Sequence, residues 1–366
     1  MKSSTGSHFI ALDHVRALAA FLVFVWHFLH ARPSVPVPFA YTPSIFPFAL
    51  LDEGHTGVAL FMTLSGYLFA RLLDGKEIFY GAFLWNRALR LLPLLAIALT
   101  IRIIVQLIQG QSLISLFCLL AKGLVLPALP NGGWSLTVEF HFYLILPLLL
   151  WLLRQPRGLI LWVVVAAIAV RACYFGMTGE VRNLAYWTMV GRIDQFVLGM
   201  FICQFRSAFT GRHLIVLSTL FAFTGFYWVF DFGGGFMRPG NPLWILLPTV
   251  EGLAYAIGIA WYETSFTHST TGVSRFISRI GEYSYFIYLF HFFIVFRVSN
   301  MIHQHHLNLS NFYLTCLWAA VVFVGMMPFG YLSSRLIETP FLRLRKPYFR
   351  VSLSGDVVTI PQRVHA

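Results

Sequence analysis

Apolar stretches of about 20 residues recur along the whole chain, and no other feature limits its folding as strongly. A stretch of this length can cross the hydrocarbon core of a bilayer as a helix. Hydrophobic residues make up 58% of the sequence and charged residues only 11%, whereas a soluble domain carries about 25% charged residues. The surface of a soluble protein of 366 residues would need more charge. The sequence therefore predicts an integral membrane protein.

Helices are expected in these stretches, because lipid cannot satisfy the hydrogen bonds of an open backbone. The predicted spans are residues 10–31, 54–72, 89–109, 133–153, 159–175, 186–205, 213–231, 243–262, 281–300 and 312–334. The expected fold is thus an all-α polytopic membrane protein, a bundle of about ten transmembrane helices. Residues 9–345 are expected to form one membrane-embedded domain, with a short basic cytoplasmic tail at residues 346–366.

The segments that join these spans are alternately rich and poor in basic residues. Lys and Arg favour the cytoplasmic side of a membrane, which assigns the net charge of +12 to topology rather than to nucleic acid. The predicted inner segments hold Lys2, Arg71, Lys76, Arg87, Arg90, Arg154, Arg157, Arg206, Arg212, Arg275, Arg279, Arg335, Arg343, Arg345, Lys346, Arg350 and Arg363. The predicted outer segments hold Arg32, Lys122, Arg182 and Arg238. Both termini are therefore predicted to be cytoplasmic.

The segment 112–129 is apolar but is interrupted by Lys122, Pro127 and Pro130. Counting it as a span would place the most basic loops of the second half outside, against the bias of basic residues toward the cytoplasm. It is predicted to be a re-entrant or interfacial segment on the outer side.

Charged side chains inside the spans are the candidates for function, because lipid makes them costly and they usually face the interior of a bundle. Arg16 and His27 are eleven residues apart in the first span. At 100° per residue they share one helical face and lie about 16 Å apart along the axis. Either one alone fits an interfacial position, but together on one face they predict a functional path.

A pair of arginines opens the third span, where Arg87 and Arg90 are neighbours at i and i+3. Charge alone fits ordinary anchoring on the cytoplasmic side. The alternative is an anion clamp, because two planar guanidinium groups suit phosphate.

A carboxylate, Glu139, lies within the fourth span and needs a polar partner there. The sequence does not name that partner, and His27 is a candidate if both residues lie in the outer half. Arg192 and Asp194 in the sixth span fit a local or interhelical ion pair. In the ninth span, Ser284 and His291 share a face, although a lone histidine there is more often a packing residue.

The cysteines give neither a disulfide framework nor zinc-ligand spacing, and no metal site is expected. Intramembrane Arg, His and Glu also line transport paths, so the residues alone leave an enzyme and a transporter open. The paired half-chain repeats that many transporters use are not evident in the sequence.

Several ordered sequence blocks resemble the membrane-embedded acyltransferase family 3, which includes bacterial O-acetyltransferases of lipopolysaccharide O-antigen and other glycans. The blocks are LDHVRALAAFLVFVWHF, GVALFMTLSGYLFARLL, WNRALRLLP, GGWSLTVEFHFYLILPLL, GRIDQFVLGM, YSYFIYLFHFF and IETPF. Two positions depart from the family pattern. Only Glu139 of a common acidic pair carries over, and Phe292 stands where a proline often follows the ninth-span histidine.

The resemblance implies an integral membrane O-acyltransferase of the bacterial plasma (inner) membrane. It would move an acyl group, most often acetyl from acetyl-CoA, to a hydroxyl of a cell-envelope or exported glycan or glycoside. Acyl-CoA is then a donor co-substrate, and no permanently bound cofactor is expected. The alternative function is a membrane transporter of a small anionic or glycosidic substrate.

The same resemblance gives the polar residues their expected roles. Arg16, Arg87 and Arg90 would bind the anionic donor on the cytoplasmic side. The distance between Arg16 and His27 is comparable to an extended pantetheine arm, which would deliver the thioester toward His27. His27 would act as the base or as the acyl acceptor, and Glu139 would orient its imidazole.

Overall fold

The computed structural model describes residues 9–31, 36–73, 75–110, 112–123, 126–127, 129–130, 132–353 and 356–358. Lys2, Arg32 and Arg363, used above for the orientation, lie outside these residues. The helices are α1 Ile10–Leu29, α2 Ala49–Asp52, α3 Thr56–Leu73, α4 Tyr80–Ile108, α5 Leu113–Gly123, α6 Trp134–Arg154, α7 Leu161–Thr178, α8 Arg182–Trp187, α9 Met189–Gln204, α10 His213–Phe232, α11 Leu247–Ser265, α12 Gly272–Glu282, α13 Ser284–His305, α14 Phe312–Gly325, α15 Met327–Ser333 and α16 Thr339–Leu342. The strands are β1 Lys76–Ile78, β2 Phe349–Leu353 and β3 Asp356–Val358.

The all-α polytopic fold predicted from the sequence is confirmed. Among the described residues, eight helices are long and apolar enough to cross a membrane: α1, α3, α4, α6, α7, α10, α13 and the stretch Phe312–Leu342. The sixth and eighth predicted spans also form helices, α9 and α11, which are not among the eight. α9 has 16 residues, and α11 carries the buried carboxyl of Glu251. The count of ten spans stays a prediction.

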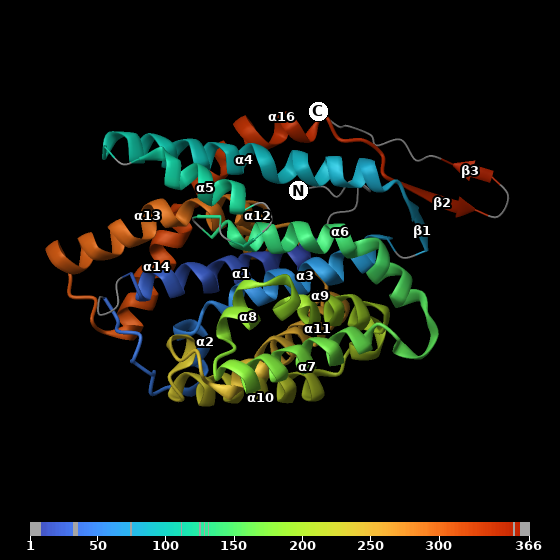
Figure 1. Cartoon of the computed structure of the whole chain (residues 1–366), viewed down its shortest axis with the longest axis horizontal. Helices are drawn as coiled ribbons and strands as arrows, with labels where there is room; N and C mark the ends of the chain where they lie inside the picture. Colours follow the sequence, from blue (N-terminus) through green and yellow to red (C-terminus); the bar gives the residue numbers. More distant parts are fainter. Residues whose placement is uncertain are drawn as a thin grey trace.

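Burial separates a central layer of helices from a peripheral one. α1 and α3 lie inside the bundle, whereas most of the hydrophobic length of α4, α7 and α10 is not buried by other parts of the protein. Figure 1 shows α1 and α3 in the middle of the bundle, with α4 along one edge and α7 and α10 along the opposite edge. Exposed large apolar side chains on the peripheral helices match a lipid-facing surface. α1 and α3 are therefore the helices best placed to carry an internal site.

Two glycines allow α3 and α9 to pack closely. A Cβ atom at Gly66 would lie 2.0 Å from the backbone oxygen of Phe196, and one at Gly199 would lie 2.1 Å from that of Thr63. Since backbone atoms cannot move aside as side chains can, neither position has room for a larger residue. Small residues at such crossings are typical of helix packing in membranes.

Replacing Gly66 with alanine should therefore push α3 and α9 apart and lower the thermal unfolding temperature of the detergent-purified protein. Overpacking of this kind costs about 1–3 kcal/mol. Gly176 on α7 is the matched control, because an added Cβ would meet no atom within 4 Å there. Gly176→Ala should be neutral or slightly stabilising. Equal unfolding temperatures for the two variants would contradict the close approach.

The loops predicted to be cytoplasmic gather at one end of the bundle. Arg154 donates to the carbonyl of Lys76 at 3.1 Å, Gln204 to that of Leu153 at 3.3 Å, and the amide of Gly211 donates to Ser265 at 2.9 Å. A small antiparallel sheet in the order β1–β2–β3 also lies at this end (Figure 1). It includes the part of the predicted basic tail between residues 349 and 358, while residues 354–355 and 359–366 lie outside the described residues.

The doubtful segment 112–129 contains α5, which has 11 residues. At 1.5 Å per residue it extends about 16 Å, roughly half the thickness of the hydrocarbon core. Its last residue, Gly123, accepts a hydrogen bond of 2.6 Å from Thr137, near the start of α6. The helix is thus too short to cross the hydrocarbon core, and the re-entrant or interfacial placement on the outer side stays a prediction.

Candidate functional site

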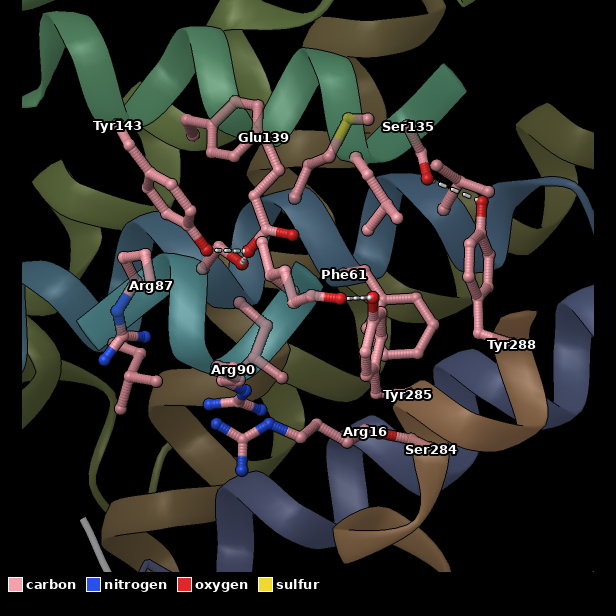
Figure 2. Close-up of a pocket in the computed structure, with 18 of the residues that line it drawn as sticks. Arg16, Phe61, Arg87, Arg90, Ser135, Glu139, Tyr143, Ser284, Tyr285 and Tyr288 are labelled. Atoms are coloured by element: carbon pink, nitrogen blue, oxygen red, sulfur yellow. Dashed lines mark hydrogen bonds between the residues drawn. The ribbon is translucent and has the colours of Figure 1, made fainter. Parts of the chain in front are cut away.

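A cavity lies between α1, α3, α4, α6 and α13 (Figure 2). Its volume is about 110 Å³. α3 and Phe196 of α9 supply much of its apolar wall. The polar side chains that line it are Arg16, Ser65, Arg87, Arg90, Ser135, Glu139, Tyr143, Ser284, Tyr285 and Tyr288. Four of the five residues expected to form the site therefore line one cavity.

The three arginines come from two helices that are distant in sequence. Arg16 is on α1, where it forms an ion pair with the buried carboxylate of Asp13. Arg87, only 8% exposed, lies over the rings of Phe69 and Phe83 at 5.3 and 5.5 Å. In Figure 2 the guanidinium groups of Arg90 and Arg16 lie next to each other. Three cations that line one cavity form a site suited to an anion.

Glu139 lies with these arginines and not with His27. It accepts a hydrogen bond from the Tyr143 hydroxyl one turn further along α6, and a long one of 3.5 Å from Ser65. The expected contact between Glu139 and His27 is therefore wrong. The reason is that α6 begins deep in the bundle: the carbonyl of Gly132, just before it, accepts a hydrogen bond of 3.1 Å from the cavity residue Tyr288. Glu139 consequently lies at the level of the arginines.

The polar partner of His27 is a second histidine. Nδ1 of His27 is 2.9 Å from the carbonyl oxygen of Val23 and 3.3 Å from Nε2 of His291. Nδ1 of His291 is 2.7 Å from the carbonyl oxygen of Tyr288. Since a carbonyl oxygen only accepts, these contacts assign the proton of each neutral ring to Nδ1. The lone pair of His27 is then on Nε2, for which no hydrogen-bond partner is found among the described residues.

His27 lies just beyond the cavity rather than in its wall. Tyr288, at the cavity's end, is 6.0 Å from His291 between ring centroids, and His291 is 4.8 Å from His27. The hydroxyl groups of Tyr288 and Ser135 lie 2.7 Å apart. The cavity of the arginines and the His27–His291 pair are therefore neighbours, separated by one hydrogen-bonded layer.

The tyrosines of α13 were not foreseen as site residues. Tyr285 donates a hydrogen bond of 2.7 Å to the carbonyl of Leu91 on α4, and Tyr288 meets Ser135 on α6. Positions 284, 285, 288 and 291 fall on one face of a helix. The spacing of the polar groups along YSYFIYLFH was therefore the sequence signal that could have identified these tyrosines as site residues.

Other buried charges belong to a separate network. Asp194 on α9 accepts a hydrogen bond of 2.7 Å from Arg171 on α7, so its ion pair is interhelical and does not involve Arg192. Arg192 instead donates to Gln195 at 3.1 Å and lies over the ring of Tyr186 at 4.3 Å. These side chains do not line the cavity. The Arg171–Asp194 pair joins α7 to α9, and Arg192 joins α9 to α8.

One family model, described as an acyltransferase domain, matches residues 9–335. The match contains Arg16, His27, Arg87, Arg90 and Glu139. No curated protein and no solved structure shows significant similarity to the chain.

Proposed function

This chain belongs to acyltransferase family 3, and from that premise we propose that it moves an acyl group from acyl-CoA to a hydroxyl of a glycan. The most common acyl group in such reactions is acetyl. We further propose that it acts as a multi-pass protein of the bacterial inner membrane. The observation that carries the proposal is the arginine-lined cavity next to His27, whose Nε2 has no hydrogen-bond partner among the described residues. All these residues lie within the family match.

The arginines support an anionic donor that enters from the cytoplasm. Arg16, Arg87 and Arg90 line the cavity at the end where the basic loops gather, which is the end predicted to be cytoplasmic. Coenzyme A carries its charge on phosphate groups, and guanidinium groups bind phosphate through paired hydrogen bonds. The thioester arm has little charge, which suits the more apolar wall beyond the arginines.

His27 is proposed as the chemical centre. Its Nε2 would take the proton of the acceptor hydroxyl while that oxygen attacks the thioester carbonyl carbon. The carbon–sulfur bond then breaks, the acyl group stays on the oxygen, and the proton passes to the departing thiolate. The same Nε2 lone pair also fits direct attack on the thioester, which would give an acyl-histidine before the acceptor reacts. His291 accepts from Nδ1–H and holds the ring in either route.

Glu139 is proposed to act on the donor side of the reaction. Its carboxylate balances part of the charge of the three arginines and holds the hydroxyl of Tyr143 in the cavity wall. Arg16 already pairs with Asp13, and a second carboxylate in the cavity lowers the cost of holding Arg87 and Arg90 in the interior of a membrane protein. Glu139 therefore supports the site that binds the donor, and its effect on His27 is indirect.

The test of this function incubates the purified protein with radiolabelled acetyl-CoA and envelope glycan. The glycan is taken from a strain that lacks the gene. An acyltransferase should leave label covalently attached to the glycan, and free CoA should appear in equal amount. A transporter would leave no covalent product, so unlabelled glycan after prolonged incubation would contradict the proposal. Acid-denatured protein serves as the control for non-enzymatic transfer.

A further inference from the structure

The chain returns to the donor site after its last helix. Residues 343–349, here called the C-terminal strap, run along the first turns of α4. Asn86 holds the strap through two hydrogen bonds to the backbone of Lys346. Its side chain donates a hydrogen bond of 2.7 Å to the carbonyl of Lys346 and accepts one of 2.9 Å from the amide of the same residue. Trp85 donates to the carbonyl of Leu344 at 3.3 Å. Because Asn86 is next to Arg87 in sequence, the strap is fixed beside the arginine cluster.

Arg345 lies between these two anchored residues of the strap. Burial and the charges of Arg90 and Arg87 lower the pKa of Arg345 to about 9, while the charge of Glu338 acts in the opposite direction. The hydrogen bonds of the next residue, Lys346, to Asn86 place Arg345 beside the first turns of α4, where Arg87 follows Asn86. Its Nε atom and that of Arg87 are buried without a hydrogen-bond partner in the described part of the chain. Positive charges held close together, with N–H groups that lack an acceptor, are typical of an anion-binding site.

The neighbouring arginine of the strap serves as a comparison, because it behaves as expected of a basic residue that only orients the protein in the membrane. Arg343 is two residues earlier, and its side chain is exposed. It adds to the positive charge of the predicted cytoplasmic end just as Arg345 does. If basic residues in this segment served orientation alone, both would be expected to face water. Arg345 is instead only partly exposed, and its buried Nε atom calls for a different role.

We propose that Arg345 is a fourth guanidinium of the donor site and binds the 3′-phosphate of the coenzyme A nucleotide. The inference rests on the proposed function, in which acyl-CoA is the donor. Arg345 does not line the cavity that holds Arg16, Arg87 and Arg90, so it meets a part of the ligand further from the thioester. The 3′-phosphate is such a part, and as a phosphomonoester it carries a charge of about −1.5 to −2 near neutral pH. Arg345 also lies beyond residue 335, where the family match ends.

The test compares the dissociation constants of CoA and of dephospho-CoA, which lacks the 3′-phosphate, by calorimetry on the full-length protein in detergent. Arg345→Ala should weaken CoA binding about tenfold or more and leave dephospho-CoA binding unchanged. Arg345→Lys should retain part of the affinity, because it keeps the charge and loses the planar fork. Arg343→Ala is the matched control and should bind both ligands as the wild type does.

Unchanged CoA affinity in Arg345→Ala, or an equal loss for both ligands, would overturn the inference. If Arg345→Ala unfolds at a lower temperature than the wild type, Arg345→Gln and Arg345→Lys decide, since only lysine should retain CoA affinity above that for dephospho-CoA. A wild-type protein that binds neither ligand would overturn both the proposed function and the inference. If the wild type binds CoA and dephospho-CoA and Arg87→Ala weakens the binding of both ligands, the proposed function stands. The role of Arg345 then depends only on whether Arg345→Ala weakens CoA binding without weakening dephospho-CoA binding.

Discussion

Replacing His27 with alanine is expected to abolish acyl transfer while leaving donor binding close to that of the wild type. The reason is that His27 lies beyond the cavity of the arginines, so its loss removes the proton acceptor without removing a contact to the donor's phosphates. A general base contributes about a hundredfold or more to the rate. The measurement is single-turnover transfer at saturating acetyl-CoA in folded, detergent-purified protein.

His141 provides the matched control for this substitution. It is also a histidine within a span, but it does not line the cavity and lies on α6 rather than at the His27–His291 pair. His141→Ala should transfer at the wild-type rate. If His27→Ala kept more than about a tenth of that rate, the loss would be smaller than a general base supplies. His27 would then be a packing residue, and His291 would become the next candidate.

His291 should behave as a positioning residue for His27. Its Nε2 accepts from Nδ1–H of His27, which the carbonyl of Val23 also accepts. His291→Ala therefore leaves one of the two contacts in place. Combining it with His27→Ala should add little further loss, because residues that act as one unit are not additive.

Arg87→Ala and Arg90→Ala are each expected to weaken acetyl-CoA binding about tenfold or more, since a charge-assisted hydrogen bond contributes about 1.5–3 kcal/mol. The rate at saturating donor should change less than the affinity, because a contact made equally in the bound and transition states lowers KM alone. The double variant should be weaker than either single one. Lysine should restore part of the affinity at each position. Calorimetric titration with acetyl-CoA measures the effect, and single-turnover transfer measures the rate.

Arg212 is the control for the arginine clamp. It lies in a loop at the same end of the bundle, and its side chain is exposed. Arg212→Ala should bind acetyl-CoA as the wild type does. Wild-type affinity in both Arg87→Ala and Arg90→Ala would mean that these residues only anchor the protein in the membrane.

The parts of the site that depend on one helix could be predicted from the sequence. Arg87 and Arg90 are one turn apart, so any helix places them on the same face, and both line the cavity. Arg16 joins them because a charged residue in a span faces the interior of the bundle. The apolar runs located the helices for the same reason, because an apolar run lies within a single helix and does not depend on how helices pack together.

Contacts that depend on how the spans are placed relative to one another could not be predicted in the same way. Glu139 was expected at the depth of His27 because its span was assumed to begin at the outer edge of the membrane. The structure starts α6 beside Tyr288 instead, and Thr137 near that start contacts the end of α5. Arg345 is a further example, since the hydrogen bonds of Asn86 to a residue 260 positions away hold it in place. The sequence shows no periodicity that links these two segments.

The layer between the cavity and His27 has a consequence for the membrane as an electrical insulator. A protein that takes one reactant from each face must not provide a continuous wet path between them, since ions would follow it. Here the hydroxyl pair of Ser135 and Tyr288 lines the arginine cavity. The rings of His27, His291 and Phe292 pack against one another next to Tyr288. If the proposed function holds, the same few side chains form both the passage for the acyl arm and the barrier to ion leakage. A wider passage for bulkier acyl groups would come at the expense of the ion gradient that the membrane maintains.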